Sequence, residues 1–131
     1  MKGYCDNIER RTIENEEFRR VLYTGHNLQL VLMTLQPAEE IGEEVHTDRD
    51  QFFRFEEGVG AVDIDGVENA VGADSAVIVP AGARHNVRNT GHVPLRLYTI
   101  YGPPEHVDGL IVKTRADAMA THEEWDGLTT E

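Results

Sequence analysis

Four side chains in two separate stretches of the sequence carry the donor atoms of a metal site. Glu44 and His46 lie two residues apart, and in a β-strand this spacing points both side chains to the same face. Gln51 lies five residues after His46, beyond a turn that could bring the chain back as the neighbouring strand. His85 follows a break at residues 80–82, where a bend could aim its ring inward.

These residue types predict a particular kind of metal chemistry. Two imidazoles, one carboxylate and one amide oxygen form a mixed nitrogen and oxygen set that suits divalent metals such as Mn, Fe, Ni or Zn. A metal with positions left for water or substrate can act as a Lewis acid. Spacing alone does not decide the ligands. Asp48 or Asp50 could replace Glu44, because both lie near His46.

Short β-strands are the elements that must position these residues. Residues 18–35 predict a β-hairpin, because two runs rich in Val, Leu and Tyr flank residues 24–27, whose Gly and Asn suit a tight turn. Counted with this hairpin, the chain has at least seven short β-segments at spacings of about 8 to 12 residues, which is typical of an all-β sandwich or barrel. Only residues 114–125 predict a helix, with Thr114 as its N-cap and a weak apolar stripe.

The second run of the hairpin is apolar on both of its faces. One face carries Leu28, Leu30 and Leu32, and the other carries Val31, Met33 and Leu35. A strand buried on both sides is an interior strand whose two faces are both covered. We therefore expect a homodimer in which a partner chain provides this cover, or cover by the C-terminal segment.

Length, composition and charge limit the class of protein. A chain of 131 residues is expected to form a single domain over residues 1–131. With 24 acidic and 12 basic residues, no nucleic-acid partner is expected, because phosphate contacts require clustered Lys and Arg. The sequence has no long apolar run, no apolar signal-peptide core and a single cysteine. We therefore expect a cytoplasmic protein with no membrane partner.

Two motifs in the chain resemble those of the cupin family. Residues 38–58, AEEIGEEVHTDRDQFFRFEEG, resemble the first motif, which runs from a glycine through His-x-His and a glutamate to a closing glycine. The positions of that motif are occupied in order by Ala38, Glu44, His46, Gln51 and Gly58. The second motif, Pro-x-Gly followed by histidine and asparagine, is matched in full by Pro80, Gly82, His85 and Asn89.

The resemblance implies a fold and a ligand set. It covers about residues 18–104 and implies a double-stranded β-helix, the jelly-roll barrel of small single-domain cupins, followed by a C-terminal extension over residues 105–131 with the short helix. It carries the family's metal ligands to Glu44, His46, Gln51 and His85. Two of these differ from the common set of three histidines and one glutamate, although four donors and one carboxylate remain. Replacing Glu44 by Asp48 or Asp50 would break the register of the motif.

Residues around this site are expected to form a ligand pocket. Phe53 and Phe55 alternate with Gln51 on one face, so we expect them to line the pocket. Tyr98 and Tyr101 lie where the last core strand runs toward the barrel mouth and could contact a ligand. His106 lies in the same stretch and could contact a ligand in the same way, although with the other scattered histidines it is expected to be solvated.

Function follows less directly, because one fold hosts many reactions. Short cupins of this kind are often labelled mannose-6-phosphate isomerase-like. We expect a metal-dependent enzyme of the isomerase or lyase type that acts on a sugar-like or other oxygenated metabolite. The alternatives are an iron-dependent dioxygenase and a non-enzymatic module that binds a small ligand or a metal.

An acidic rim over residues 39–57 disfavours anionic substrates. The countercharges for such a substrate would be Arg54, Arg84, Arg88 and Arg96.

Overall fold

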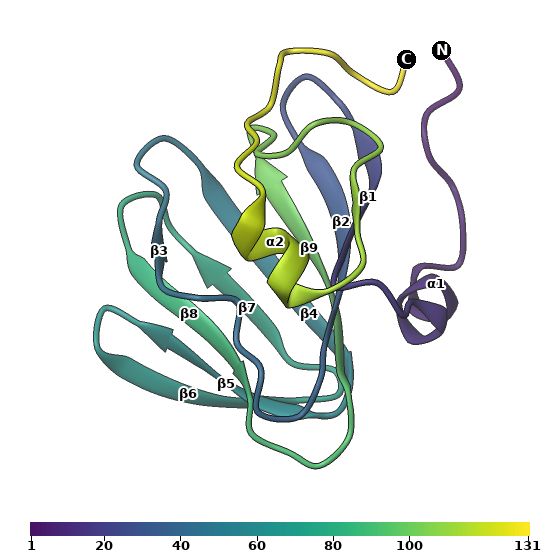
Figure 1. Ribbon diagram of the computed structural model, residues 1–131. Helices are drawn as coiled ribbons and strands as arrows, with labels where there is room; N and C mark the ends of the chain where they lie inside the picture. The colour runs from purple at the N-terminus through teal and green to yellow at the C-terminus, as the bar shows by residue number, and fades with distance from the viewer.

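Two antiparallel sheets face each other in a computed structural model that describes residues 1–131 (Figure 1). The six-stranded sheet has the order β10 (Ile111–Val112), β1 (Arg19–Thr24), β2 (Gln29–Leu35), β9 (Leu95–Gly102), β4 (Asp50–Glu57) and β7 (Ala76–Val79). The four-stranded sheet has the order β3 (Glu44–Val45), β8 (Arg84–Asn89), β5 (Val59–Ile64) and β6 (Val67–Gly72). This is the all-β, jelly-roll architecture that the sequence predicts.

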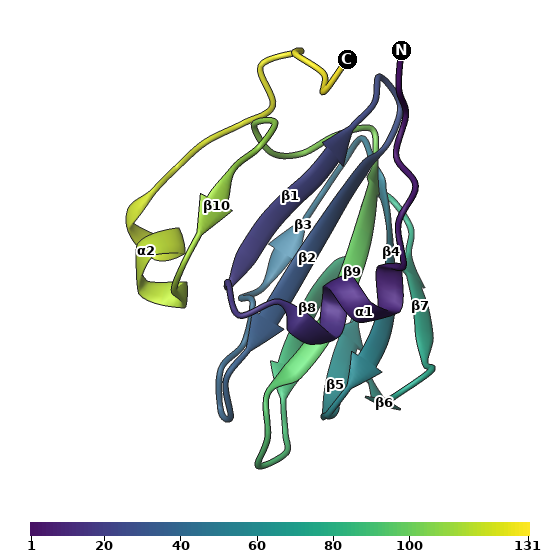
Figure 2. The same ribbon diagram turned by 90° about the vertical axis from the view of Figure 1, so that its right-hand side faces the viewer.

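β1 and β2 form the predicted hairpin, and β2 is an interior strand between β1 and β9. Val31, Met33 and Leu35 face the core between the sheets. Part of the opposite face of β2 is covered by a helix that the sequence did not predict, α1 (Ile8–Glu14), which lies across β2, β9 and β4 (Figure 2). α1 buries only Thr12, so it lacks the apolar periodicity by which a helix is recognised.

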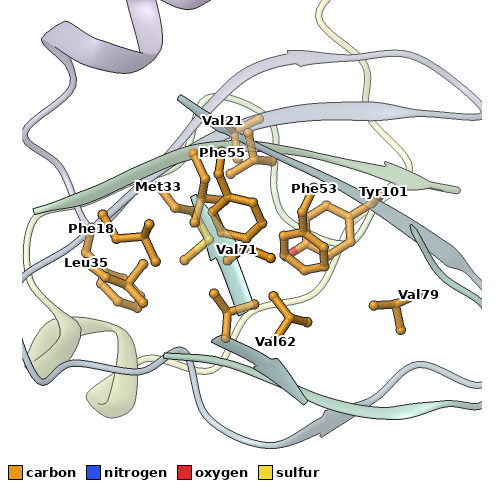
Figure 3. Packing of buried hydrophobic residues seen from close by; sticks show 14 of the residues in the cluster. Phe18, Val21, Met33, Leu35, Phe53, Phe55, Val62, Val71, Val79 and Tyr101 are labelled. Atoms are coloured by element: carbon orange, nitrogen blue, oxygen red, sulfur yellow. The ribbon is translucent and has the colours of Figure 1, made fainter. Parts of the chain in front are cut away.

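The core fills the space between the two sheets (Figure 3). In β4 the side chains alternate, so that Phe53 and Phe55 are fully buried while Phe52 points to the outer face. The rings of Phe53 and Phe55 stack with centroids 6.4 Å apart. β4 therefore has its aromatic side chains on the face that also carries Gln51.

Gly58, which closes the first motif, joins β4 to β5 at a point where no side chain fits. Its φ of +89° is in the left-handed region, and a Cβ atom there would lie 2.6 Å from the carbonyl oxygen of Pro94. Both the backbone conformation and the close approach of another strand therefore require glycine.

The C-terminal extension adds a strand and a helix to the barrel. β10 pairs with β1, and α2 (Arg115–Ala120) follows it, crossing the front of the molecule in Figure 1. The short helix is present as predicted, and Thr114 caps it by accepting a hydrogen bond from the Asp117 N–H. It ends at Ala120 rather than at residue 125, and Met119 is 61% exposed, so the weak apolar stripe is not buried. Neither helix is long and apolar enough to cross a membrane.

Candidate metal centre

Three of the four predicted ligands meet at one end of the barrel. The ligand atoms of Glu44, His46 and His85 all lie within 4.8 Å of one another. Antiparallel pairing of β3 with β8 places Glu44 directly opposite His85, and His46 follows β3 immediately. The two imidazole rings are 5.4 Å apart. Strand register thus brings together residues that are 41 positions apart in the chain.

The fourth predicted ligand, Gln51, comes from β4 in the opposite sheet. It is buried and lines the same small pocket as Glu44 and His85. Its side-chain Nε2 donates to the Thr99 hydroxyl at 3.0 Å, and its Oε1 has no hydrogen-bond partner. The oxygen that an amide offers to a metal is therefore free in this pocket.

A second buried donor atom at the site is also without a hydrogen bond. Nε2 of His46 lies 2.8 Å from Oε2 of Glu44, but the two groups are not aligned for a hydrogen bond. Buried polar atoms without partners are rare and are explained where an ion binds them. Because the free atoms of His46 and Gln51 are both ligand atoms, the residues of this pocket fit a divalent metal.

Neighbouring groups orient the two histidines. Nδ1 of His85 lies 3.1 Å from the Ala83 carbonyl oxygen, so a proton on Nδ1 is donated there and Nε2 stays free for a metal. Nδ1 of His46 lies 3.3 Å from Oε2 of Glu105, and Arg49 donates to the same oxygen at 2.8 Å. Carboxylate or carbonyl partners on the second ring nitrogen are typical of metal-binding histidines.

The charges of Glu44 and His46 are mutually stabilised. Burial opposes ionisation of Glu44, but the adjacent His46 keeps the pKa of Glu44 below its ordinary value, with smaller contributions from Arg19 and His85. The same contact raises the pKa of His46 against the opposing effect of burial. In the absence of a metal the pair is therefore stabilised as a carboxylate beside a protonated imidazole, and a metal that binds here would replace that proton.

The alternative acids, Asp48 and Asp50, are engaged elsewhere. Asp48 is exposed and forms an ion pair with Arg49. Asp50 is exposed and accepts a hydrogen bond from the Ala81 N–H at 2.8 Å. Glu44 is the carboxylate that the structure places beside the two histidines.

Of the four predicted pocket residues, the structure brings two to the site. Phe53 and Tyr101 line the pocket with Gln51 and His85, and both are labelled among the buried residues of Figure 3. Phe55 lies deeper in the core. Tyr98 lies on the outer face of the sheet, 6.2 Å from Phe52 between ring centroids, because it alternates with the inward-facing Thr99.

A hydrogen-bonded chain behind the pocket was missed by sequence reasoning. The Tyr101 hydroxyl lies 3.3 Å from Nε2 of His106, and Nδ1 of His106 lies 2.5 Å from Oε1 of Glu123. His106 is only 7% exposed, which corrects the expectation that it is solvated. Glu123 comes from the segment after α2, and its distance from His106 in the sequence left no local signal for this contact.

Comparisons with known proteins identify the family. The Cupin domain family matches residues 31–101, and the chain belongs to this family, as its two motifs predicted. The crystal structure of BH2720 from Bacillus halodurans is similar, with 46% identity and a TM-score of 0.90 over 92% of this chain and 96% of that one. YrkC of Bacillus subtilis (strain 168) is 44% identical over 128 residues, which are 93% of this chain and 69% of YrkC. Protein L612 of Acanthamoeba polyphaga mimivirus is 37% identical over 113 residues, covering 82% of this chain and 70% of L612.

Proposed function

We propose that this protein is a metal-dependent enzyme that acts on a small oxygenated metabolite as an isomerase or a lyase. The observation that carries the proposal is the convergence of Glu44, His46 and His85 in a pocket where the buried Oε1 of Gln51 has no hydrogen-bond partner and the buried Nε2 of His46 contacts only Glu44, itself one of the three residues. Metal binding explains all of these features together.

A cleft next to this pocket can admit the substrate. It has a volume of about 610 Å³, which is within the usual range for small-molecule sites. Glu44 lines both the cleft and the small pocket. An oxygen of a molecule bound in the cleft would therefore lie close to the metal ligands.

The chain supplies groups for moving a proton at that point. A divalent ion held by Glu44, His46, Gln51 and His85 would act as a Lewis acid that polarises a carbonyl or hydroxyl oxygen. Burial raises the pKa of Tyr101, so its hydroxyl stays protonated, and its single O–H can be directed either to Nε2 of His106 or to a substrate oxygen. His106 holds that hydroxyl in position, and Glu123 in turn orients the His106 ring.

Metal analysis tests the ligand set. Protein purified without added metal is expected to contain a divalent ion in stoichiometric amount, and His46→Ala and His85→Ala are each expected to lose it. His92→Ala is the matched control, because His92 is exposed and outside the ligand cluster. Full metal retention in both ligand variants would refute the site.

Isotope exchange tests the reaction. Metal-loaded protein is incubated in deuterium oxide with a panel of sugars, hydroxy acids and oxo acids, and NMR detects deuterium that enters the carbon next to a carbonyl group. We expect exchange with one class of compound, and its loss in Tyr101→Phe. Oxygen consumption by the iron-loaded protein would instead identify a dioxygenase. Binding without any turnover would identify a non-enzymatic module.

A further inference from the structure

We infer that the cleft beside the metal pocket recognises a carboxylate group on the ligand, and that Arg19, with Arg115, binds it. The inference rests on the proposed function, because the metal pocket fixes one end of the ligand and the arginines its other end. It assigns the substrate to the small hydroxy and oxo acids.

The first observation is the pairing of the arginines across the whole chain. Seven of the ten arginines form ion pairs with Asp or Glu, namely Arg10, Arg11, Arg49, Arg54, Arg84, Arg88 and Arg96. The other three, Arg19, Arg20 and Arg115, have no carboxylate partner. Two of these three, Arg19 and Arg115, line the same cleft. In a chain with twice as many acidic as basic residues, unpaired arginines gathered at one site call for a ligand.

Arg19 is the stronger of the two candidates. It projects from β1 into the cleft that Glu44 also lines, its Nε is buried, and that atom has no hydrogen-bond partner. The guanidinium carbon lies 5.4 Å from the centroid of the Phe18 ring, a contact that favours a defined orientation of the group. A planar fork of N–H donors is thus available for an acceptor beside the metal pocket.

Arg115 contributes from the wall that α2 forms. Its Nε donates to the carbonyl oxygen of Glu40 at 2.5 Å, which ties the side chain to the barrel. No carboxylate lies within ion-pair distance of its guanidinium group. The C-terminal extension therefore brings a second cationic group to the cleft.

The glutamates of the cleft form no ion pair with these arginines and most of them have closer partners, although the charge of Arg19 does lower the pKa of Glu44 and of Glu123. Glu44 contacts His46, Glu105 is bound by Arg49, and Glu123 accepts from His106 and from the Val107 N–H. Only Glu124 is left without such a partner among the cleft residues. Because neither arginine lies within ion-pair distance of an acid, the N–H groups of Arg19 and the remaining N–H groups of Arg115 are available to an external anion.

A carboxylate fits this arrangement best. The guanidinium fork matches two carboxylate oxygens in a bidentate pair, while a nearby hydroxyl or carbonyl oxygen of the same molecule can reach the metal ligands. This revises the expectation that the acidic rim disfavours anionic substrates. The arginines named for that role from the sequence, Arg54, Arg84, Arg88 and Arg96, are all held in ion pairs.

A matched pair of ligands and a matched pair of variants test the inference. Lactate and propane-1,2-diol have the same carbon skeleton and differ in the carboxylate, and NMR titration of the metal-loaded protein measures both affinities. We expect lactate to bind about tenfold more tightly or better, as a charge-assisted bidentate pair allows. Arg19→Gln should remove this preference. Arg20→Gln should keep the preference for lactate. This substitution removes the same charge from the same strand, but Arg20 lines a different pocket.

Three results would overturn the inference. They are equal affinity for lactate and the diol, an equal loss of lactate affinity in Arg19→Gln and Arg20→Gln, or binding of inorganic phosphate that is tighter than that of lactate and depends on Arg19.

Thermal unfolding of each variant checks that it is folded, and Arg115→Gln provides a second variant that should weaken lactate binding. A metal titration of the same samples separates the two proposals. Normal metal binding without carboxylate preference overturns this inference alone, whereas wild-type protein that binds no metal overturns the proposed function.

Discussion

Two buried glutamines in this chain have opposite hydrogen-bonding states. The Gln29 amide is fully bonded: its Nε2 donates to the Thr24 hydroxyl and the His106 carbonyl oxygen, and its Oε1 accepts from the N–H groups of Glu105 and His106. Gln51 is equally buried, but its Oε1 has no partner. An unsatisfied buried acceptor costs stability, so Gln51 is better explained by ligand binding than by folding.

Substitution of these two glutamines by leucine separates the two roles. In the metal-free protein, Gln51→Leu should change the free energy of unfolding by less than about 1 kcal/mol, because it removes an unsatisfied acceptor along with one hydrogen bond. Gln29→Leu should cost about 3 kcal/mol or more, because it leaves backbone groups of residues 105 and 106 without partners. Urea unfolding measures both values.

Metal titration of the same variants completes the comparison. Gln51→Leu should weaken metal binding about tenfold or more, within the effect expected when one oxygen ligand is lost. If Gln51→Leu destabilises the metal-free protein as much as Gln29→Leu, then Gln51 is a structural residue and its place in the ligand set is wrong.

Among the elements, the turn between β4 and β5 depends on a single glycine. Gly58→Ala places a methyl group against the backbone of Pro94 and strains a positive φ, so it should lower the free energy of unfolding by about 3 kcal/mol. Gly66→Ala is the control, because its φ is also positive at +84° but no atom lies within 4 Å of the added Cβ. That substitution should cost about 1 kcal/mol. Equal losses in thermal unfolding experiments would show that backbone strain alone accounts for Gly58.

The segment after α2 is held to the barrel by Glu123. Burial opposes ionisation of this carboxyl, but the hydrogen bonds from His106 and Val107 keep the pKa of Glu123 below its ordinary value of 4.5. His106 and Arg19 are the charged groups that face it. Because the folded pKa is the lower one, this stabilisation is fully present above pH 4.5 and is lost as the pH falls through the folded value.

The single tryptophan of the chain can report the release of this segment. Trp125 lies two residues after Glu123, and its backbone N–H donates to the Glu105 carbonyl oxygen, while its indole N–H donates to the Leu128 carbonyl oxygen. In Glu123→Gln we expect the fluorescence emission of Trp125 to be red-shifted at neutral pH. The segment should open about fivefold more often, because the substitution lowers the free energy that holds it to the barrel by about 1 kcal/mol. Wild-type protein should show the same shift only below pH 4.5, before its far-ultraviolet circular dichroism changes. A shift that coincides with global unfolding would contradict this.

Sequence reasoning succeeded where a residue's environment follows from its neighbours in the chain. The alternation of side chains along a strand correctly predicted that Phe53 and Gln51 point inward and Phe52 outward. The spacing of the two motifs correctly predicted that His46 and His85 lie close together. It failed where the environment depends on distant partners. Arg19 looks like any arginine in a strand, and only the fold reveals that it lies near Glu44 and Glu123 without forming an ion pair with either of them.

At the scale of the whole molecule, the outer face of the six-stranded sheet keeps an apolar row. α1 covers part of this face (Figure 2), which removes the original argument that β2 needs a partner chain. One register row nevertheless runs across four strands through Leu30, Ile100, Phe52 and Ile78. Ile78 is 67% exposed, and the other three are partly exposed. A second copy of the chain is the occupant that we expect on this row.

Size-exclusion chromatography with light scattering tests this expectation over a range of concentrations. The wild-type protein should elute with twice the chain mass of 14.7 kDa, and Ile78→Lys should shift it to the monomer, because a buried lysine in an apolar interface has no partner. Val67→Lys is the control, since Val67 is similarly exposed at 63% but lies in β6 of the other sheet. It should leave the mass unchanged. A wild-type protein that is monomeric at all concentrations, or a dimer that tolerates lysine at position 78, would exclude this face as the interface.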